Sequence, residues 1–209
     1  MDYFNTQYEK FYEEKDYYWG LEPADFLDEL IELIANRTKR IKVLDIGCGE
    51  GKDAVYMAQK GFDVTAFDIT ESGIRKTKFL AAERGVEINA FVADINNFDV
   101  NDQFDIIYST GTIQYLQDKN IKGFFENIKA MTSMNGFNYF NVFVEKTFLE
   151  LPPDWDKEEK MWKTGELFKH YGDWKIHKID EVIFEDLSGG SKHFHCMDTL
   201  LAEKRLQRR

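Results

Sequence analysis

Residues 42–70 read KVLDIGCGEGKDAVYMAQKGFDVTAFDIT. A short apolar run ends at Asp45, three glycines follow at alternate positions, a helical pattern comes next, and a second apolar run ends at Asp68. This order of strand, glycine turn, helix, strand and acid is typical of half of a nucleotide-binding βαβ unit. We therefore expect the chain to bind a nucleotide-like ligand at this turn.

The residues around the glycines indicate which kind of ligand the turn holds. Glycine is needed where the backbone adopts unusual dihedral angles or approaches a ligand closely. Residues 49–54 also fit the GxGxxA spacing of dinucleotide-binding folds, so an NAD-type ligand is an alternative. However, Asp45 before the turn and Glu50 within it would repel a pyrophosphate and could meet a cationic ligand. The DxGxGxG pattern therefore favours a ligand with an amino group and a sulfonium.

Two further acids follow the next two predicted strands. Asp68 should face the same crevice as the glycine turn, because parallel strands end at one edge of a sheet. Its carboxylate can accept both hydroxyls of a ribose, or it can cap the next helix. Asp94 can accept a hydrogen bond from an exocyclic amine such as that of adenine, with the backbone of Ile95 meeting the ring nitrogens. Alternatively, Asp94 forms a turn before Asn96 and Asn97.

The rest of the chain alternates strand and helix patterns. Aromatic residues at helical spacing predict an N-terminal helix up to about residue 14, and an apolar stripe predicts another from Pro23. Asn135-Gly136 indicates a turn. The other predicted elements are strands at 41–45, 64–68, 89–92, 104–108 and 139–144, and helices at 53–60, 73–84 and 121–131.

The C-terminal part breaks this alternation. A long connection over 145–163 and a short helix over 165–170 precede two strand patterns, 175–185 and 193–203, joined by Ser-Gly-Gly-Ser at 188–191. Such a hairpin places its last strand antiparallel. We predict an α/β fold: a doubly wound, mostly parallel seven-stranded sheet with an antiparallel C-terminal strand and helices on both faces. Residues 1–209 should form one domain, with 1–36 as a helical lid and 145–163 as a substrate-side loop.

Composition and net charge limit the binding partners and the cellular location that we expect. The chain has 209 residues, a net charge of −11 and a pI near 4.9, which disfavours a nucleic-acid partner. Its two cysteines form no CxxC pair. Neither a signal peptide nor a membrane span is indicated, so we expect no membrane partner and a cytoplasmic location. Either a monomer or a homodimer is compatible with the sequence.

Four segments resemble successive motifs of Rossmann-like S-adenosylmethionine-dependent methyltransferases: DIGCGEG at 45–51, AFDIT at 66–70, VADINNF at 92–98 and FDIIYSTGTIQYL at 104–116. The resemblance covers roughly residues 20 to 205. It implies that the first motif lies beside the amino acid part of the cofactor, the second at the ribose, the third at the adenine and the fourth near the transferable methyl. The cofactor-binding residues implied in this way are Asp45, Gly47, Cys48, Gly49, Gly51, Asp68, Ile69, Asp94, Ile95, Ser109 and Thr110.

Within that superfamily the chain is most similar to the tellurite-resistance methyltransferases, on GKDAVYMAQKGFDVTAFD at 51–68 and KTGELFKHYGDWKIHKIDE at 163–181. The segment YYWG at 17–20 also resembles thiopurine-type methyltransferases, in which an aromatic N-terminal segment covers the cofactor. One departure concerns the last hairpin. Phe184, Glu185 and Cys196 stand where that family carries basic residues, although Lys192 and nearby histidines could supply positive charge.

No catalytic residue is identified, because methyl transfer from a sulfonium depends mainly on alignment. His193 and His195 alternate along a strand, so their rings share a face, but as a metal pair they lack a third ligand. We therefore expect no metal centre. The predicted function is methyl transfer from S-adenosylmethionine to a small molecule, such as a thiol or a chalcogen oxyanion. A non-catalytic S-adenosylmethionine-binding protein and an NAD-dependent oxidoreductase are the alternatives. The acceptor-side candidates are Tyr18, Trp19, Thr110 and His195.

Overall fold

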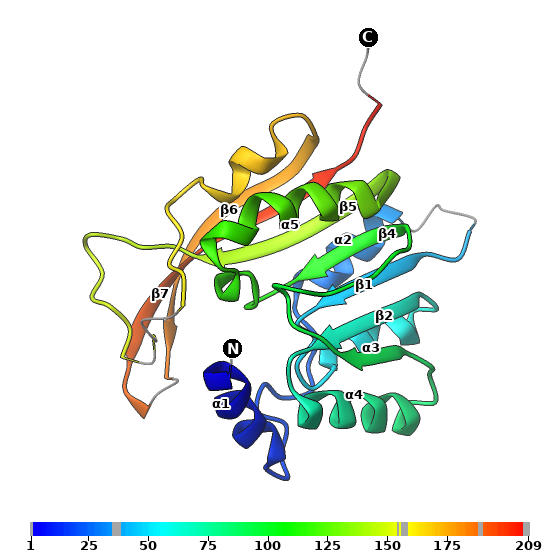
Figure 1. Cartoon of the computed structure of the whole chain (residues 1–209), viewed down its shortest axis with the longest axis horizontal. Coiled ribbons are helices and arrows are strands. Elements are labelled where there is room, and N and C mark those ends of the chain that lie inside the picture. The colour runs from blue at the N-terminus through cyan, green and yellow to red at the C-terminus, as the bar shows by residue number, and fades with distance from the viewer. Residues whose placement is uncertain (1, 35–38, 154, 156–158, 188–189, 207–209) are drawn as a thin grey trace. The chain divides into compact units, whose positions relative to one another are not determined.

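The computed structural model describes residues 2–34, 39–153, 155, 159–187 and 190–206. Their seven strands belong to one sheet, in the order β3-β2-β1-β4-β5-β7-β6 (Figure 1). The chain divides into two compact units, Met1–Val100 and Asn101–Arg209, which are described in turn. No helix among the described residues combines the length and apolarity needed to cross a bilayer.

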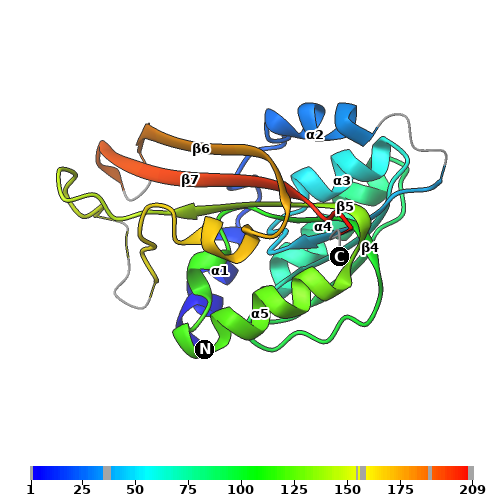
Figure 2. The same ribbon diagram turned by 90° about the horizontal axis from the view of Figure 1, so that it is seen from above.

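Unit 1 is built on three parallel strands. The register pairs Asp45 with Ala66 and Ala66 with Ala90, so the three strands run side by side. Figure 2 shows α2 and α3 over the same face of these strands. The elements of unit 1 are α1 (Asp2–Glu13), α2 (Phe26–Ile34), β1 (Lys42–Ile46), α3 (Lys52–Gln59), β2 (Asp63–Asp68), α4 (Glu71–Glu83) and β3 (Asn89–Val92).

Helix α2 illustrates why these elements form. Leu27, Leu30 and Ile34 lie on one face and are buried, as the apolar stripe predicts. Asp28 and Glu29 occupy its first turn, where negative charge stabilises a helix. The sequence pattern therefore sets both the position of this helix and the face that it buries.

Unit 2 contains the antiparallel part of the fold. Strands β4 and β5 are parallel, and β7 pairs antiparallel with both β5 and β6. The predicted α/β class with a C-terminal hairpin is therefore confirmed, while Ser188 and Gly189 of its connection lie outside the described residues. The elements are β4 (Phe104–Ser109), η1 (Ile113–Tyr115), α5 (Asp118–Met131), β5 (Thr132–Phe143), η2 (Leu167–Tyr171), β6 (Lys175–Asp186) and β7 (His193–Glu203), where η marks 3₁₀ helices.

The predicted turn at Asn135-Gly136 is wrong. Both residues lie inside β5, and Asn135 has a φ of 61°. The register between β4 and β5 shifts between Phe104 and Ile106, and the Asn135 N–H donates to the carbonyl of Lys204 at 2.9 Å. Asn and Gly tolerate positive φ in bulges as well as in turns. Here they bend a long strand instead of ending it.

A satisfied polar network stabilises the core of unit 2. Phe125 packs edge-on against Trp162 and Tyr171. The Asn138 side chain donates to the Tyr171 hydroxyl at 2.8 Å and accepts from the Thr132 hydroxyl at 2.8 Å. Burial raises the pKa of Tyr171, so its hydroxyl stays neutral. Because each buried group has a partner, this network supports β5 without a desolvation penalty.

Candidate functional site

The backbone conformation of the turn explains why its three glycines stand at alternate positions. Gly47, Gly49 and Gly51 all adopt positive φ, at 75°, 54° and 89°. This left-handed conformation costs other residues about 1–2 kcal/mol. The N–H groups of Gly47 and Cys48 donate to the carbonyl of Phe67, at 2.8 and 3.0 Å, which fastens the turn to β2. The alternate glycines thus follow from alternate left-handed positions.

Helix α4 packs so closely against this turn that side chains would not fit. A Cβ on Gly51 would lie 2.6 Å from the Thr77 hydroxyl, and one on Gly73 would lie 2.7 Å from the carbonyl oxygen of Gly49. The Thr77 hydroxyl also donates to that carbonyl at 3.2 Å. Both glycines are therefore required by close approach, and α4 holds the turn in place.

Asp68 joins the turn to the start of α4. Its Oδ2 accepts from the Gly49 N–H at 2.9 Å, and its Oδ1 accepts from the N–H and the hydroxyl of Thr70 at 2.9 and 2.6 Å. Burial raises the pKa of Asp68, and these hydrogen bonds oppose that rise. The expectation that Asp68 lies beside the glycine turn is confirmed. Through Thr70, the residue that precedes α4, it also fixes the start of that helix, whereas its predicted contact with a ribose stays a prediction.

Two nearby acids each keep an oxygen without a hydrogen-bond partner in the described structure. Oδ2 of Asp45 and Oδ2 of Asp94 are both buried and unbonded. Asp94 Oδ1 accepts from the backbone and side chain of Asn96, at 2.8 and 3.2 Å, so the predicted turn forms as well. Burial, followed by the charges of Asp53 and Asp68, raises the pKa of Asp45.

These unbonded oxygens indicate the kind of ligand that fits. Buried polar atoms rarely lack a partner, so two of them in one unit suggest that a partner is supplied from outside the chain. Both are acceptors, and they belong to acids near the ends of β1 and β3, the two parallel strands that flank β2. They suit a nucleoside that carries amino groups, whereas the charge of Asp45 and Asp68 disfavours a pyrophosphate.

Glu50 does not have its predicted role as a partner for a cationic ligand. Its side chain is only 2% exposed, and its Oε1 lies 2.7 Å from Nζ of Lys76. Its Oε2 accepts from the backbone N–H of Trp19 at 3.3 Å. Lys76 also donates to the carbonyl of Asp16 at 2.6 Å. Glu50 is therefore part of an internal ion pair that holds the N-terminal segment.

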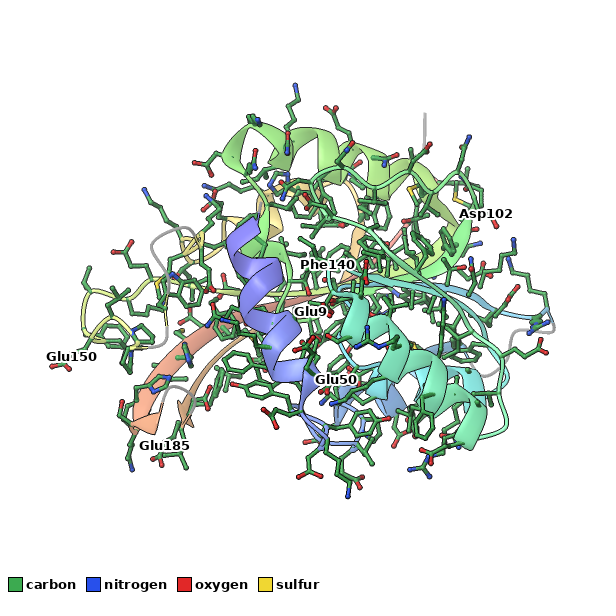
Figure 3. The ribbon with its side chains drawn as sticks, turned by 60° about the horizontal axis from the view of Figure 1, so that its bottom comes forward. Glu9, Glu50, Asp102, Phe140, Glu150 and Glu185 are labelled. Atoms are coloured by element: carbon green, nitrogen blue, oxygen red, sulfur yellow. The ribbon has the colours of Figure 1, made fainter. Side chains whose placement is uncertain are left out.

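The N-terminal segment lies directly on the glycine turn. Tyr12 is 5% exposed, and its hydroxyl is 3.1 Å from the position of a Cβ on Gly49. The Trp19 indole N–H donates to this hydroxyl at 2.9 Å, and the Ser72 N–H donates to the Glu9 carboxylate at 2.9 Å. Figure 3 labels Glu9 on α1, above the turn that carries Glu50. The sequence reasoning missed Tyr12 and Glu9, although Tyr8 and Tyr12 at helical spacing were an available signal.

Other predicted cofactor residues lie on this turn or beyond it. Cys48 is partly buried, with Sγ 3.9 Å from the Thr77 hydroxyl, and burial raises its thiol pKa. It is therefore suited to packing and not to nucleophilic attack. Ile69 is partly buried and Ile95 is buried.

The remaining candidates fall in two places. Tyr18 and Trp19 in unit 1 are 42% and 49% exposed, and their rings meet edge to face. Ser109 and Thr110 belong to unit 2, at the end of β4, where Ser109 is fully buried and Thr110 partly buried. The carbonyl of Thr110 accepts from the hydroxyl of Thr112 at 3.2 Å.

Comparison with known proteins identifies the family. Residues 4–189 match the family described as "Tellurite resistance protein TehB". The chain belongs to the TehB family. A relative from Haemophilus influenzae, "Probable S-adenosyl-L-methionine-dependent methyltransferase TehB", is 27% identical over 144 residues, which are 69% of this chain and 49% of the relative. The chain thus spans about half the length of this curated relative.

Solved structures support the fold. The crystal structure of TehB from Haemophilus influenzae superposes with a TM-score of 0.74 at 24% identity, over 85% of this chain and 62% of that one. A structure described as "Conversion of a Disulfide Bond into a Thioacetal Group during Echinomycin Biosynthesis" gives a TM-score of 0.71 at 17% identity, over 98% and 91% of the two chains. The predicted Rossmann-like architecture is therefore shared with both proteins.

The hairpin of this TehB family member departs from one sequence expectation. His193 and His195 face the same side, as predicted, with their Nε2 atoms 3.0 Å apart. The expectation that no third ligand lies nearby is wrong, because Asp186 Oδ2 is 3.6 Å from His195 Nε2. Asp186 stands opposite His193 in the β6–β7 register, and that pairing is not visible in the sequence.

A cavity of about 250 Å³ lies in unit 2. The predicted substrate-side loop and the acceptor-side candidate His195 both contribute to its wall, so the structure brings these two predictions together. Its lining residues are Phe143, Val144, Glu145, Lys146, Thr147, Leu149, Glu150, Leu151, Pro152, Met161, Phe194, His195 and Cys196.

We expect Asp45→Asn to stabilise the ligand-free chain at pH 7. The raised pKa of Asp45 means that the folded state holds this proton more tightly than the unfolded state does. The stability is thus greatest below the unfolded pKa of about 3.9 and falls as the pH rises through the folded-state pKa. Removing the charge should raise the free energy of unfolding by on the order of 1 kcal/mol at pH 7. Urea titrations at pH 5 and pH 7 measure this, with the exposed Asp63→Asn as the control. Equal loss of stability in both variants would contradict the expectation.

Proposed function

We propose that this chain is an S-adenosylmethionine-dependent methyltransferase that acts on a small molecule. The observation that carries the proposal is the pair of buried, unbonded carboxylate oxygens on Asp45 and Asp94, while Asp68, on the strand between theirs, contacts the glycine turn. Membership of the TehB family and the name of its Haemophilus influenzae relative support it.

Each acid has a distinct role in this proposal. Asp45 Oδ2 accepts from the ammonium of the cofactor, and Asp94 Oδ2 accepts from the adenine amine. Asp68 accepts one hydroxyl of the ribose and not both, because three donors already occupy its carboxylate and about one of its roughly four acceptor sites is left. Ile95 contributes its backbone beside the adenine ring. All of these residues lie in unit 1, whereas the predicted cofactor residues Ser109 and Thr110 belong to unit 2.

Methyl transfer then requires little acid–base or nucleophilic chemistry from the side chains. When bound, S-adenosylmethionine supplies a methyl group that is already activated by the positive sulfur. The chain must align an acceptor and exclude water, and alignment alone supplies about 7–11 kcal/mol in well-oriented reactions. This agrees with the absence of a Ser-His-Asp or Cys-His arrangement among the predicted site residues.

We further propose that the acceptor is a small thiol and not a hard oxyanion. Most side chains around the unit 2 cavity are apolar or weakly polar, including Phe143, Met161 and Phe194. The charge that Lys192 was expected to supply is neutralised, since its Nζ lies 2.5 Å from a Glu185 oxygen.

We expect the chain to bind S-adenosylmethionine or its demethylated product, and Asp68→Ala to weaken binding about 10- to 100-fold. This follows from losing hydrogen bonds to a charged group, at roughly 1.5–3 kcal/mol each. Isothermal titration calorimetry measures it. Asp94→Asn tests the site without disturbing the Gly49 contact, and Asp63→Ala on the exposed start of β2 serves as the control. Circular dichroism confirms that each variant is folded. Tight binding of a nicotinamide dinucleotide in place of S-adenosylmethionine would overturn the proposal.

We expect turnover with small thiols to exceed turnover with tellurite or selenite at equal concentration. The cavity wall is mostly apolar, and its acids Glu145 and Glu150 outnumber its one lysine, Lys146, so it favours a soft nucleophile over a hydrated oxyanion. Mass spectrometry of the methylated product, together with the amount of S-adenosylhomocysteine formed, measures the rates. Cofactor binding without turnover on any acceptor would indicate the non-catalytic alternative. Faster reaction with tellurite would contradict the choice of a thiol.

The described part of the predicted lid, residues 2–34, forms a cover over the cofactor site in this proposal, while residues 1, 35 and 36 lie outside the described residues. Tyr12 rests on Gly49, and α1 is tied to α4 through Glu9 and Ser72. A segment in this position must move or repack when a ligand enters. Hydrogen bonds from Trp19 to Glu50, from Ser72 to Glu9 and from Lys76 to the carbonyl of Asp16 hold it on the glycine turn and α4, so it can return and exclude water afterwards.

The cover predicts a change in tryptophan fluorescence when S-adenosylhomocysteine binds. Trp19 donates to Tyr12 and is half exposed, so repacking of the segment should alter its emission. A fluorescence titration should show the change in the parent chain and in Trp174→Phe, which alters unit 2, but not in Trp19→Phe. If Trp19→Phe keeps the full change while still binding the ligand, the segment does not repack.

A further inference from the structure

The end of the β6–β7 hairpin carries a group of ligand-type side chains outside the proposed cofactor site. Asp186, His193 and His195 each direct one ligand atom inward, and these atoms all lie within 4.8 Å of one another. Asp186 comes from β6 and both histidines come from β7. Figure 3 labels Glu185, the chain neighbour of Asp186, at the end of this hairpin.

The spacing resembles that of a coordination shell. The two imidazole Nε2 atoms are 3.0 Å apart, and His195 Nε2 is 3.6 Å from Asp186 Oδ2. Ligands at about 2.0–2.1 Å from a tetrahedral Zn²⁺ lie about 3.3 Å from each other. Both observed distances fall within a few tenths of an ångström of that value. Small side-chain rotations are therefore enough to complete the geometry.

The orientation of the His193 ring is also suitable for binding a metal ion. Its Nδ1 lies 2.7 Å from the carbonyl oxygen of Ser191, which can only accept a hydrogen bond. Nδ1 therefore carries the proton, and in the neutral ring the Nε2 lone pair faces His195. A backbone carbonyl that fixes the tautomer of a histidine in this way is a common feature of metal-ligating histidines.

A hydrogen bond between the two imidazoles is the competing explanation of the 3.0 Å contact. It accounts for the pair, with His195 as the donor, whereas a metal ion would also engage the carboxylate of Asp186, whose Oδ1 accepts from the Leu187 N–H at 2.6 Å. Asp186 Oδ2 is beyond hydrogen-bonding distance from His195 Nε2, yet it faces the same point in space. His195 is only 4% exposed and His193 only 9%, whereas the Asp186 side chain is 34% exposed, so the two imidazoles are shielded from water and the carboxylate borders solvent.

We propose that Asp186, His193 and His195 bind one divalent transition-metal ion of the zinc class. Two imidazoles favour such ions over Mg²⁺ and Ca²⁺, which prefer oxygen ligands. Three protein ligands leave at least one coordination position for water or a small exogenous ligand. The bound ion links β6 to β7 near their connection. Through His195 it also adjoins the wall of the unit 2 cavity. The inference does not depend on the proposed methyltransferase activity.

The site predicts the binding of one Zn²⁺ per chain. The full chain, without a histidine tag and treated with chelator, is titrated with Zn²⁺ by calorimetry and with Co²⁺ by visible absorption. We expect Zn²⁺ to raise the melting temperature, Co²⁺ to give visible bands, and equimolar Mg²⁺ to do neither. His193→Ala, His195→Ala and Asp186→Asn should each weaken Zn²⁺ binding on the order of 100-fold, because each removes a direct ligand.

His177→Gln is the matched control. His177 lies on β6 of the same hairpin and also contacts a carboxylate, with Nε2 2.7 Å from Glu203 Oε2, but no second imidazole is paired with it. This variant should bind Zn²⁺ as the parent chain does. The Co²⁺ spectrum of the unmodified chain tests imidazole coordination even if a variant fails to fold. Absence of binding to the unmodified chain, or binding that survives His193→Ala/His195→Ala, would overturn the proposal.

Discussion

The hydrogen bond from the Gly49 N–H to the carboxylate of Asp68 is the contact on which unit 1 depends. An ionised carboxylate that is almost fully buried costs several kcal/mol unless donors surround it. Asp68 has three, from Gly49 and Thr70, and hydrogen bonds to a charged group contribute about 1.5–3 kcal/mol each. One side chain thus fixes both the glycine turn after β1 and the entry into α4.

The rest of unit 1 follows from the helix placed in this way. Because α4 starts beside Asp68, its first turns approach the glycine loop so closely that Gly73 cannot carry a side chain. The same turns present Ser72 and Lys76, which hold Glu9 and Glu50. The N-terminal segment therefore packs on α4 as well as on the turn, and its position is a consequence of the Asp68 contacts. A chain of polar contacts runs from the ligand-binding turn to the first helix.

The order of the elements was predictable because buried parallel strands read as continuous apolar runs and amphipathic helices show one stripe, as Leu27, Leu30 and Ile34 do. The errors share another origin. The Asn135-Gly136 pattern predicts a turn, but Asn and Gly suit bulges equally well, so the sequence does not distinguish the two. The sequence predicts that Glu50 could meet a cationic ligand. Its actual partner, Lys76, is brought to it by tertiary packing alone, which the sequence pattern does not show.

The cluster on the hairpin was missed for the same reason. Alternation placed His193 and His195 on one face of a strand, and that local inference was correct. Whether a third group joins them depends on which residue of β6 stands opposite, and a shift of one residue would turn Asp186 to the other face of the sheet. The pattern within one strand carries no information on that register. Sites built across strands are therefore harder to predict than sites at the ends of strands, where topology alone brings the residues together.

The buried acids of unit 1 also connect the cover with its ligand. Each buried oxygen without a donor, on Asp45 and on Asp94, costs about 1–3 kcal/mol, which is a large share of the 5–15 kcal/mol that stabilises a typical domain. Burial raises the pKa values of Asp45 and Asp68, so a negative charge is costly beside the turn that Tyr12 covers. A closed cover and an ionised Asp45 therefore oppose each other in the empty site. A ligand with a positive charge and an amine removes that opposition, because it supplies the missing donors. By linkage, such a ligand stabilises the closed arrangement to the same extent that closure strengthens its binding.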